Sequence, residues 1–386
     1  MNGAKTRGAA DIRLRGFSNR APAAAVEQWI DAAAATLPAE EIDAAAAAGR
    51  VLASPLSAPR DWPPADRAII DGYAVRAAET IGAGDYNPIS LALAHAARPL
   101  AGGGAALVAA GLVPPHGADA ILPFEAVHAE GARLDIFAAA AAGAGIERQG
   151  QQIRRGGLLL PAGKLLRAQD AALLALFGIA RVAVVRRPRI RLEIAGPKPL
   201  GEGLPGDANG PLLRHLIARD GGVVTEAPAD AVIAVGRSAA GPDDAAPAAL
   251  AAAGEVAIHG VAMRPGGSAA FGRRDGVPAI LLPGDPLACL AAYELFAGRL
   301  VRRLAGREAR LPHPVREAEL GKKIVSAVGL LDFQQVAFID GRAQPQSSPE
   351  SGSLLSAVRV DGFVLVPPES EGYAPGARVA VYLYES

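Results

Sequence analysis

The chain has 386 residues, of which 51% are apolar, and its 39 basic residues are balanced by 39 acidic residues. This length predicts about two to four domains with sizeable cores. The balanced charge argues against a protein that binds nucleic acid or a membrane surface through bulk electrostatics. The single cysteine, Cys289, excludes a disulfide framework, and the six scattered histidines show no pair at metal-ligand spacing.

The N-terminal segment 1–20 holds five basic side chains and no apolar core, so we expect a disordered tail and not a signal peptide. The longest apolar stretch, 168–185, is interrupted by Gln169, Asp170 and Arg181. It is therefore not expected to span a membrane. Together these features predict a soluble, cytoplasmic protein.

In the first part of the chain the predicted secondary structure changes twice, from helical to β and back. An apolar stripe at helical spacing predicts a helix over 22–36, and acidic residues in a first turn predict a second helix over 40–50. From 51 to 154 short apolar runs are separated by proline and glycine, which is typical of an all-β region. A helix at 167–177 and a strand at 182–185 follow, so the first region is predicted to resume after an insertion.

Strands and helices alternate from residue 187 onward. This alternation is typical of a parallel sheet with helices on both faces, a three-layer α/β domain. After residue 311 proline, glycine and short strands indicate a small terminal barrel or sandwich. The predicted strands of the α/β domain are 190–194, 223–224, 231–235, 256–259 and 279–282, its first helices are 212–219 and 245–253, and the terminal strands are 323–327, 335–338, 362–366 and 378–383.

The step from strand to helix within 279–296 is a candidate binding element. After the apolar run comes Pro283-Gly284, and Asp285-Pro286 then has the form of an N-cap followed by proline at the first helical position. Such a step presents free N–H groups and a positive dipole end at the edge of a parallel sheet, where ligands bind. An ordinary strand–helix joint has the same form, so this motif alone leaves both interpretations open.

Ordered motifs further along the chain point to a family. The sequence DRAIIDGYAVR at 66–76 resembles the DNSAMDGYAVR signature of the MoeA/gephyrin family of molybdopterin molybdenumtransferases. Further motifs follow in the family's order and extend to residue 356. They are 110–125, similar to TGAP-x-PEGADAVV-x-x-E; 186–196, similar to RRPRVA-x-x-STG; 207–209, in the place of DSN; 265–272, similar to PGKP-x-AFG; 282–288, similar to LPGNPVS; 331–334, LDFQ; and 352–356, GSLLS.

The resemblance implies an α/β multidomain fold with four domains. They are a split helical linker domain (18–50 and 155–186), an all-β insertion (51–154), an α/β domain like the molybdopterin adenylyltransferases (187–308) and a C-terminal β-barrel (309–386). The resemblance also implies a homodimer whose active site lies between the α/β domain of one subunit and the β insertion of the other. The implied reaction inserts molybdate into adenylylated molybdopterin with release of AMP, and it uses a divalent cation, Mg²⁺.

The same resemblance assigns candidate site residues. A phosphoanhydride bound to Mg²⁺ needs carboxylates for the metal and N–H donors for the phosphate, while molybdate needs basic groups. Asp71 and Asp243 are the candidate catalytic and metal-binding carboxylates. Alternatively, Asp71 shapes the turn before Gly72, Asp243 caps the next helix, and Arg264 is an ordinary surface arginine. The candidate substrate-binding residues are Gly196, Lys198, Gly236, Ser238, Arg264, Ser268, Pro283, Gly284, Asp285 and Pro286.

The chain departs from the family at its polar groups. Pro197 and Lys198 stand where the STGDEL loop has acidic residues, and Gln152 replaces a carboxylate of the motif GEDI. The motif PGKP has become 265–268, PGGS, which lacks the lysine. Between 225 and 230 a strand–helix step that carries further acidic residues is missing.

Two interpretations follow from these departures. In the first, which we favour, the protein is an enzyme of molybdenum cofactor biosynthesis with a rearranged metal site. In the second it is a non-catalytic protein of the same fold that holds molybdopterin, or a partner such as a molybdoenzyme or another protein of cofactor synthesis. A third and weaker interpretation gives the pocket to another phosphorylated ligand. Fold alone does not separate them, because function belongs to the site.

Overall fold

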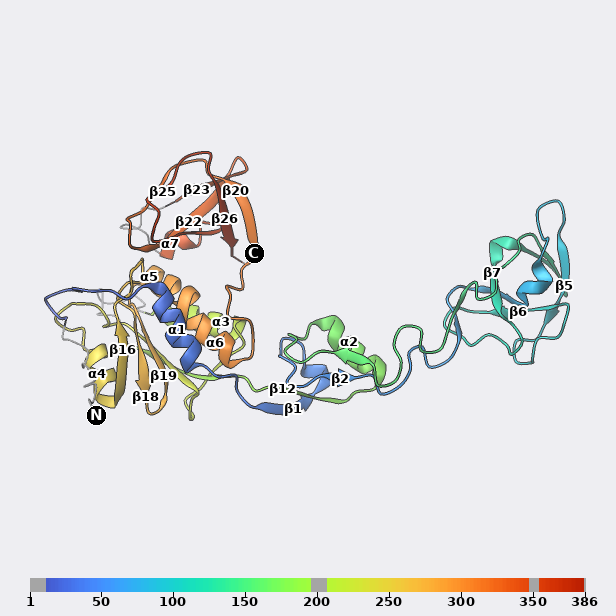
Figure 1. Cartoon of the computed structure of the whole chain (residues 1–386), viewed down its shortest axis with the longest axis horizontal. Helices are drawn as coiled ribbons and strands as arrows, with labels where there is room; N and C mark the ends of the chain where they lie inside the picture. Colours follow the sequence, from blue (N-terminus) through green and yellow to red (C-terminus); the bar gives the residue numbers. More distant parts are fainter. Residues whose placement is uncertain (1–11, 196–206, 347–353, 385–386) are drawn as a thin grey trace, which may run out of the picture. The chain divides into compact units, whose positions relative to one another are not determined.

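The structure is a computed structural model that describes residues 12–195, 207–346 and 354–384 (Figure 1). The chain divides into two compact units. The first comprises Met1–Ala53, Leu165–Ala168 and Arg181–Ser386, and the second comprises Ser54–Lys164 and Gln169–Ala180. The second unit is thus inserted in the sequence of the first. The finer division into four domains remains a prediction.

A six-stranded mixed sheet lies at the centre of the first unit, with the strand order β14-β13-β15-β19-β18-β16. Its strands are β13 (Arg189–Ile194), β14 (Val223–Val224), β15 (Ala231–Val235), β16 (Gly254–His259), β18 (Ala270–Arg274) and β19 (Val277–Leu282). The strands β14, β13, β15 and β19 run parallel to one another. Their carboxyl ends therefore meet at one edge of the sheet.

The other half of this sheet corrects the predicted alternation of strands and helices. Strand β18, which the sequence analysis did not predict, pairs antiparallel with both β19 and β16. A two-residue turn, Asp275-Gly276, joins β18 to β19, and its φ angles are 51° and 82°. Asp-Gly in this conformation is a strong hairpin signal. Strand β18 itself, with the sequence AFGRR, has too little apolar alternation to indicate a strand, so the turn is its only sequence signal.

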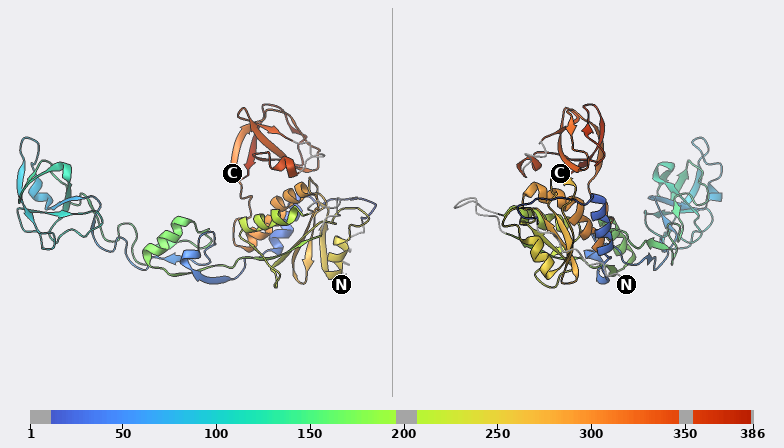
Figure 2. Two further views of the ribbon diagram at one scale, coloured as in Figure 1. Left: turned by 180° about the vertical axis from the view of Figure 1, so that it is seen from behind. Right: turned by 60° about the vertical axis from the view of Figure 1, so that its left-hand side comes forward.

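Helices cover both faces of the sheet, as Figures 1 and 2 show. On β15, Ile233 packs with the helices of one face, while its neighbour Val232 packs with Leu250 of α4 (Ala246–Ala253) on the other. This follows from the two-residue period of a strand. The helices of the first face are α1 (Ala23–Ala33), α3 (Asn209–Arg219), α5 (Pro286–Ala292), η4 (Tyr293–Ala297) and α6 (Gly298–Leu304). None of the helices in the described parts of the chain is long and apolar enough to cross a bilayer.

The predicted helix over 40–50 is wrong. Ala39–Asp43 is strand β1, which pairs antiparallel with β12 (Arg181–Val185), and Ala44–Ala46 is a single 3-10 turn capped by Asp43. Arg50 fastens this segment by donating a hydrogen bond to the Val185 carbonyl at 2.9 Å. Alanine favours helix, but so short a segment without an apolar stripe gains more from a strand partner.

The second unit contains a six-stranded sheet with the order β7-β4-β6-β5-β9-β8. Its strands are β4 (Gly72–Val75), β5 (Ile89–Ala94), β6 (Gly104–Val108), β7 (Ala120–Pro123), β8 (Val127–Glu130) and β9 (Arg133–Ile136). The DGY motif lies at the start of β4. A Cβ atom on Gly72 would lie 2.0 Å from the Leu122 carbonyl oxygen of β7, so only glycine permits this close pairing.

The remaining elements of the second unit are short. Strand β2 (Leu56–Ser57) pairs with β11 (Leu158–Leu160), and β3 (Arg67–Ala68) pairs with β10 (Ile146–Glu147). Helix α2 (Ala168–Phe177) lies where the sequence predicts a helix. Its Phe177 ring packs against Trp62, with the ring centroids 5.8 Å apart.

A third sheet, formed mainly by the C-terminal residues, has the order β17-β22-β24-β26-β20, with β23 paired to β22. Its strands are β17 (Met263–Arg264), β20 (Val315–Glu319), β22 (Leu331–Ile339), β23 (Arg342–Pro345), β24 (Gly362–Val366) and β26 (Arg378–Leu383); β21 (Ile324–Val325), β25 (Gly372–Tyr373) and α7 (Leu354–Ala357) lie beside them in the chain. Strand β17 precedes β18 in sequence yet pairs in parallel with β22. The C-terminal sheet therefore borrows a strand from the α/β region.

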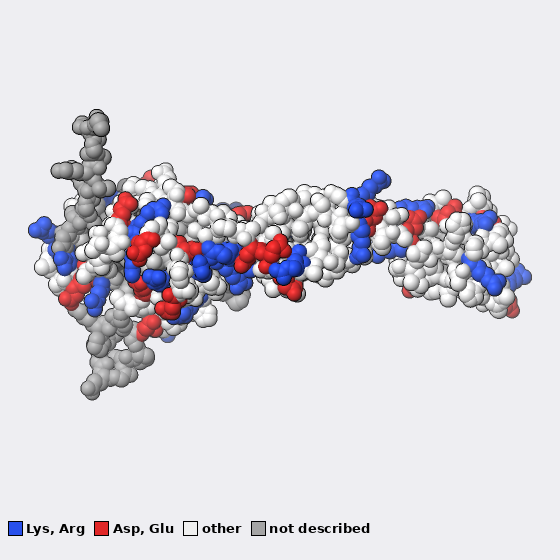
Figure 3. All heavy atoms as spheres, turned by 90° about the horizontal axis from the view of Figure 1, so that it is seen from below, with Lys and Arg blue, Asp and Glu red and all other residues white. Residues whose placement is uncertain are grey.

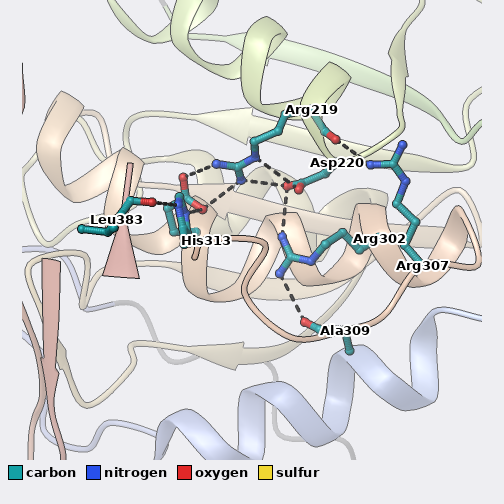
Figure 4. Close-up of polar contacts among 8 residues, drawn as sticks. Arg219, Asp220, Arg302, Arg307, Ala309, His313 and Leu383 are labelled. Carbon is teal, nitrogen blue, oxygen red and sulfur yellow. Dashed lines mark hydrogen bonds and ion pairs between the residues drawn. The ribbon is translucent and has the colours of Figure 1, made fainter. Parts of the chain in front are cut away.

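A buried network of charged side chains also joins these two regions (Figure 4). The fully buried Glu294 carboxylate accepts two hydrogen bonds from Arg219, at 2.8 and 2.9 Å, and one from His313 Nε2 at 3.0 Å. His313 Nδ1 lies 3.0 Å from the Leu383 carbonyl oxygen of β26. Both ring nitrogens of His313 thus lie within hydrogen-bond distance of an oxygen atom.

A second buried carboxylate completes this network. Asp220, at the end of α3, accepts hydrogen bonds from Arg219 and Arg302, each at 3.1 Å. Arg307 donates to the Arg219 carbonyl at 2.6 Å. Each buried charge thus has an opposite partner, which is the condition under which charges are tolerated in a protein interior.

The surface charge is mixed. On the face drawn in Figure 3, basic and acidic side chains are interspersed along the chain and do not gather into one large patch of a single sign. This agrees with the balanced composition. It gives no support to binding through bulk charge.

Candidate binding site at the sheet edge

The carboxyl ends of three parallel strands form a compact edge in the first unit. The Ala195 N–H donates to the Val235 carbonyl at 3.0 Å, and the Gly236 N–H donates to the Leu282 carbonyl at 2.9 Å. A Cβ atom on Gly284 would lie 3.4 Å from the Gly236 Cα. The two glycine loops therefore approach each other closely, and they bring the predicted residues Gly236 and Gly284 together.

The step from β19 to α5 has the predicted form. Asp285 is the N-cap of α5, where its Oδ1 accepts the Ala288 N–H at 2.9 Å, and Pro286 occupies the first helical position. Pro283 is buried beneath this turn, while Asp285 is exposed. The predicted cap is confirmed, because the chemistry of Asp-Pro at a helix start is local.

Asn209 is a member of this edge that the sequence analysis did not select. Its Nδ2 donates to the Gly284 carbonyl at 2.9 Å, and the side chain is buried at the start of α3. Nearby, Asp207 Oδ1 accepts the Gly210 N–H at 2.8 Å. Both residues belong to 207–209, which occupies the place of the family motif DSN, so the motif was a usable signal.

Cys289 lies in α5 just behind the capped turn. Burial, together with the nearby charges of Asp285 and Asp207, raises the pKa of its thiol to about 12. The thiol is therefore neutral at physiological pH. A neutral buried thiol is inert, which excludes a nucleophilic cysteine at this edge.

We expect Asp285→Asn to tighten the binding of an anion at this turn while changing stability little. The carboxylate neutralises part of the positive end of α5, whereas asparagine caps a helix without adding charge. Titration of the variant and the wild type with molybdate or AMP measures the difference. Equal affinities would show that no anion reaches this turn.

A pair of serines lies beside the glycine loops. Ser238 Oγ, from the loop after β15, is 3.3 Å from Ser268 Oγ, which precedes β18. The Ser238 backbone carbonyl accepts a hydrogen bond from His259 Nε2 at 2.8 Å. Two predicted substrate-binding residues are thus brought together, and their hydroxyl groups are donors suited to an oxyanion.

Arg264 forms an ion pair that the sequence analysis did not predict. It forms an ion pair with Asp332, whose side chain is fully buried, across the register of β17 and β22. Its charge is therefore neutralised within the fold, and the arginine is neither an ordinary surface residue nor an uncommitted anion ligand. Residue spacing along the chain gives no indication of this distant partner.

The two candidate catalytic carboxylates, Asp71 and Asp243, lie in loops of different units. In the second unit, Asp71 Oδ1 accepts the Ala110 N–H at 2.8 Å, which holds a turn. In the first unit, α4 follows Ala245 without a side-chain cap, so the suggestion that Asp243 caps it is wrong. It is Asp244 that accepts the Gly241 N–H in this loop.

A divalent cation has no ready site in the described parts of this single chain. Within these residues, no group of three or more His, Cys, Asp or Glu side chains lies suitably to hold a metal. Gln152, in the place of a family carboxylate, donates to Glu147 at 2.6 Å. The described residues of one chain thus offer no carboxylate cluster that would hold Mg²⁺ by itself. The predicted residues Gly196 and Lys198 lie outside the described residues.

Family models match three successive parts of the chain. They are the MoeA N-terminal region (domains I and II) at 21–178, a probable molybdopterin binding domain at 206–303, and the MoeA C-terminal region (domain IV) at 317–384. The chain belongs to the MoeA family. The glycine loops, the capped turn and the serine pair all lie within the second of these MoeA-family regions.

Individual relatives agree over most of the chain. A putative molybdopterin biosynthesis protein of Methanocaldococcus jannaschii is 26% identical over 377 residues, which cover 89% of this chain and 92% of the relative. Molybdopterin molybdenumtransferase 1 of Mycobacterium tuberculosis is 29% identical over 363 residues, 81% of this chain and 83% of the relative. The crystal structure of the molybdopterin biosynthesis MoeA protein from Pyrococcus horikoshii matches with a TM-score of 0.81 and 26% identity, over 95% of this chain and 100% of that one. The MoeA-like multidomain α/β fold is therefore shared.

Proposed function

We propose that this protein acts in molybdenum cofactor biosynthesis and that its sheet edge binds adenylylated molybdopterin and molybdate. The observation that carries the proposal is the edge itself: closely packed glycine loops, a capped turn and a serine pair, within the region matched as a molybdopterin binding domain. Relatives named molybdopterin molybdenumtransferase support the transfer of molybdenum to molybdopterin, and the family resemblance implies that molybdate is inserted with release of AMP.

The chemistry of these ligands suits the residues at the edge. Phosphate and molybdate are oxyanions, which bind to N–H and O–H donors held in fixed positions. The hydroxyl groups of Ser238 and Ser268 are such donors, and the exposed Gly284 leaves the backbone of its turn accessible. The residues of this chain thus position the anions of the substrate.

The second interpretation, a binding protein without catalysis, draws on one observation. The described residues lack a carboxylate cluster for a metal, and Gln152 has an amide where the family has a carboxylate. The lack of such carboxylates lowers the rate of the chemical step, but it leaves the groups that bind the substrate's anions in place. We therefore retain the enzymatic proposal with a weakened chemical step.

The test is whether the purified protein retains molybdopterin or its adenylate. We expect one of them to co-purify from a host that makes the cofactor, and to be released on denaturation. Detection by fluorescence of the oxidised pterin provides the measurement. A protein that is free of pterin, and that does not bind the added adenylate, would contradict the proposed function.

We further propose that the protein is a homodimer. Ile69, Leu112 and Val113 are 57%, 59% and 64% exposed beside the DGY motif. Backbone hydrogen bonds between residues 68 and 111–112 bring them into one apolar patch, and such patches mark interaction surfaces. Light scattering at micromolar concentration is expected to give twice the mass of one chain. A monomer mass would exclude a site shared between subunits.

A further inference from the structure

The N-terminal arm, defined here as residues 12–21, lies against the loops that carry the serine pair. The Leu14 N–H donates to the Ala240 carbonyl at 2.8 Å, just after Ser238. The Ala21 N–H donates to the Gly260 carbonyl at 2.9 Å, and Ala21 accepts the Ala262 N–H at 2.8 Å. These residues were predicted as part of a disordered tail. That prediction is wrong for 12–20, because the backbone of the arm is hydrogen-bonded at both ends.

Phe17 anchors the middle of the arm. Its ring meets His259 edge to face, with ring centroids 5.0 Å apart. A Cβ atom on Gly260, where φ is 89°, would lie 2.4 Å from the Phe17 ring, so glycine is required for the ring to rest there. Since His259 also donates a hydrogen bond to the Ser238 carbonyl, the anchor is connected to the serine pair through His259.

Arg20 extends from this anchor to the loop at 265–268. Its guanidinium carbon lies 5.4 Å from the centre of the Phe17 ring, a cation–π contact, and its Nη1 is 3.4 Å from the position of a Cβ atom on Gly267. The sequence analysis placed Gly267 where the family motif PGKP has a lysine. In this loop a Cβ atom there would also lie 2.9 Å from the Met263 carbonyl oxygen. The Arg20 guanidinium therefore lies beside Gly267, the position at which the family motif has a lysine.

Of two arginines near the loop 265–268, one is already neutralised and the other is not. Arg264 is neutralised by Asp332. Arg20 is exposed and, in the described parts of the chain, forms no ion pair. A positive partner favours the binding of a tetrahedral oxyanion beside the Ser238–Ser268 pair, and an arginine fork matches such an anion with two parallel hydrogen bonds.

We propose that Arg20, Ser238 and Ser268 form a binding site for a tetrahedral oxyanion, in which the N-terminal arm supplies the cation that the loop 265–268 lacks. This inference rests on the proposed function, for which the oxyanion is molybdate or a phosphate of the adenylate. Arg20 is a binding residue in this site, and Phe17 positions it.

The experiment is calorimetric titration of the full-length protein with molybdate and, separately, with inorganic phosphate. We expect Arg20→Gln to weaken the binding of the favoured anion about tenfold or more, since hydrogen bonds to charged groups are among the strong ones. Arg20→Lys retains part of the affinity, because it keeps the charge and loses the fork. The matched control is Arg15→Gln, which removes the same charge from an exposed residue of the same arm and should leave the affinity unchanged.

Wild-type affinity in Arg20→Gln would overturn the inference, as would equal losses in Arg20→Gln and Arg15→Gln, which would indicate a general charge effect. Phe17→Ala provides a second check: it should weaken binding with Arg20 intact, and unchanged affinity would contradict the anchored arm. Binding of phosphate alone, dependent on Arg20, would support this site and contradict molybdate as its ligand. A protein that retains molybdopterin but binds neither anion would overturn this inference and leave the proposed function standing.

Discussion

Replacement of Glu294 by alanine is expected to lower the free energy of unfolding by about 3–5 kcal/mol, the range for breaking one side of a buried ion pair. The carboxylate is fully buried and accepts hydrogen bonds from Arg219 and His313. Its removal leaves Arg219 and His313 in the interior without their shared acceptor. Urea unfolding of the variant and the wild type measures the loss.

The control for this prediction is Glu308→Ala. Glu308 pairs with Arg310, and both side chains are largely exposed, so little change in stability is expected. The two variants remove the same chemical group from positions close in sequence and different in burial. A Glu294→Ala protein as stable as the Glu308→Ala protein would show that the network contributes nothing measurable.

The same carboxylate predicts a dependence on pH. Burial raises the pKa of Glu294, but hydrogen bonds from His313 and Arg219 outweigh it, and the pKa falls below its ordinary value of 4.5. A group with a lowered pKa stabilises the fold fully above its unfolded value, and this contribution is lost as the pH falls through the folded pKa. The difference between wild type and Glu294→Ala should therefore be constant near neutral pH and should narrow below about pH 4.5.

Release of AMP from adenylylated molybdopterin, with molybdate and Mg²⁺ present, is expected to be several powers of ten slower than in a relative with intact acidic loops. Each lost electrostatic contact costs roughly a hundredfold or more in rate. Gln152, Pro197 and Lys198 occupy positions where the family has carboxylates or their loop. Lys198 adds a positive charge, but a lysine does not organise an attacking water as a divalent cation does.

Binding should outlast this loss of rate, because the residues that shape the edge are retained. Gly236 and Gly284 still allow the loops to approach, and Asp285 caps α5 in the place of the asparagine of the family motif. Chromatographic measurement of AMP, alongside binding of the same substrate, separates the two quantities. Turnover equal to that of the relative would mean that a metal site exists which the sequence comparison misplaced.

The sequence predicted features that depend on neighbouring residues. Asp285-Pro286 specified a helix cap through local hydrogen-bond chemistry, and the apolar run at 231–235 specified a buried strand. It failed where a distant partner decides the outcome. Ala39–Asp43 is a strand because β12 is available to pair with it, in spite of its helical propensity.

In the candidate site, too, local motifs are readable from the sequence and contacts between distant residues are not. Ser238 and Ser268 are predicted to bind substrate from family motifs alone, and the structure adds that their hydroxyl oxygens lie 3.3 Å apart. The neutralisation of Arg264 by Asp332 joins residues 68 positions apart in the chain, and the placement of Arg20 beside Gly267 joins residues farther apart still. No local pattern contains such information.

The two-residue strand β17 limits where this chain can be divided into fragments that fold. It lies within the sequence of the α/β region, yet it is the edge strand of the C-terminal sheet and carries the arginine that meets the buried Asp332. A gene fragment that stops before residue 317 would keep Arg264 and lose its counter-ion, while a fragment that starts there would lose a strand. The C-terminal region is consequently not a detachable module, and recombination between relatives at that boundary would have to preserve both halves of the Arg264–Asp332 pair.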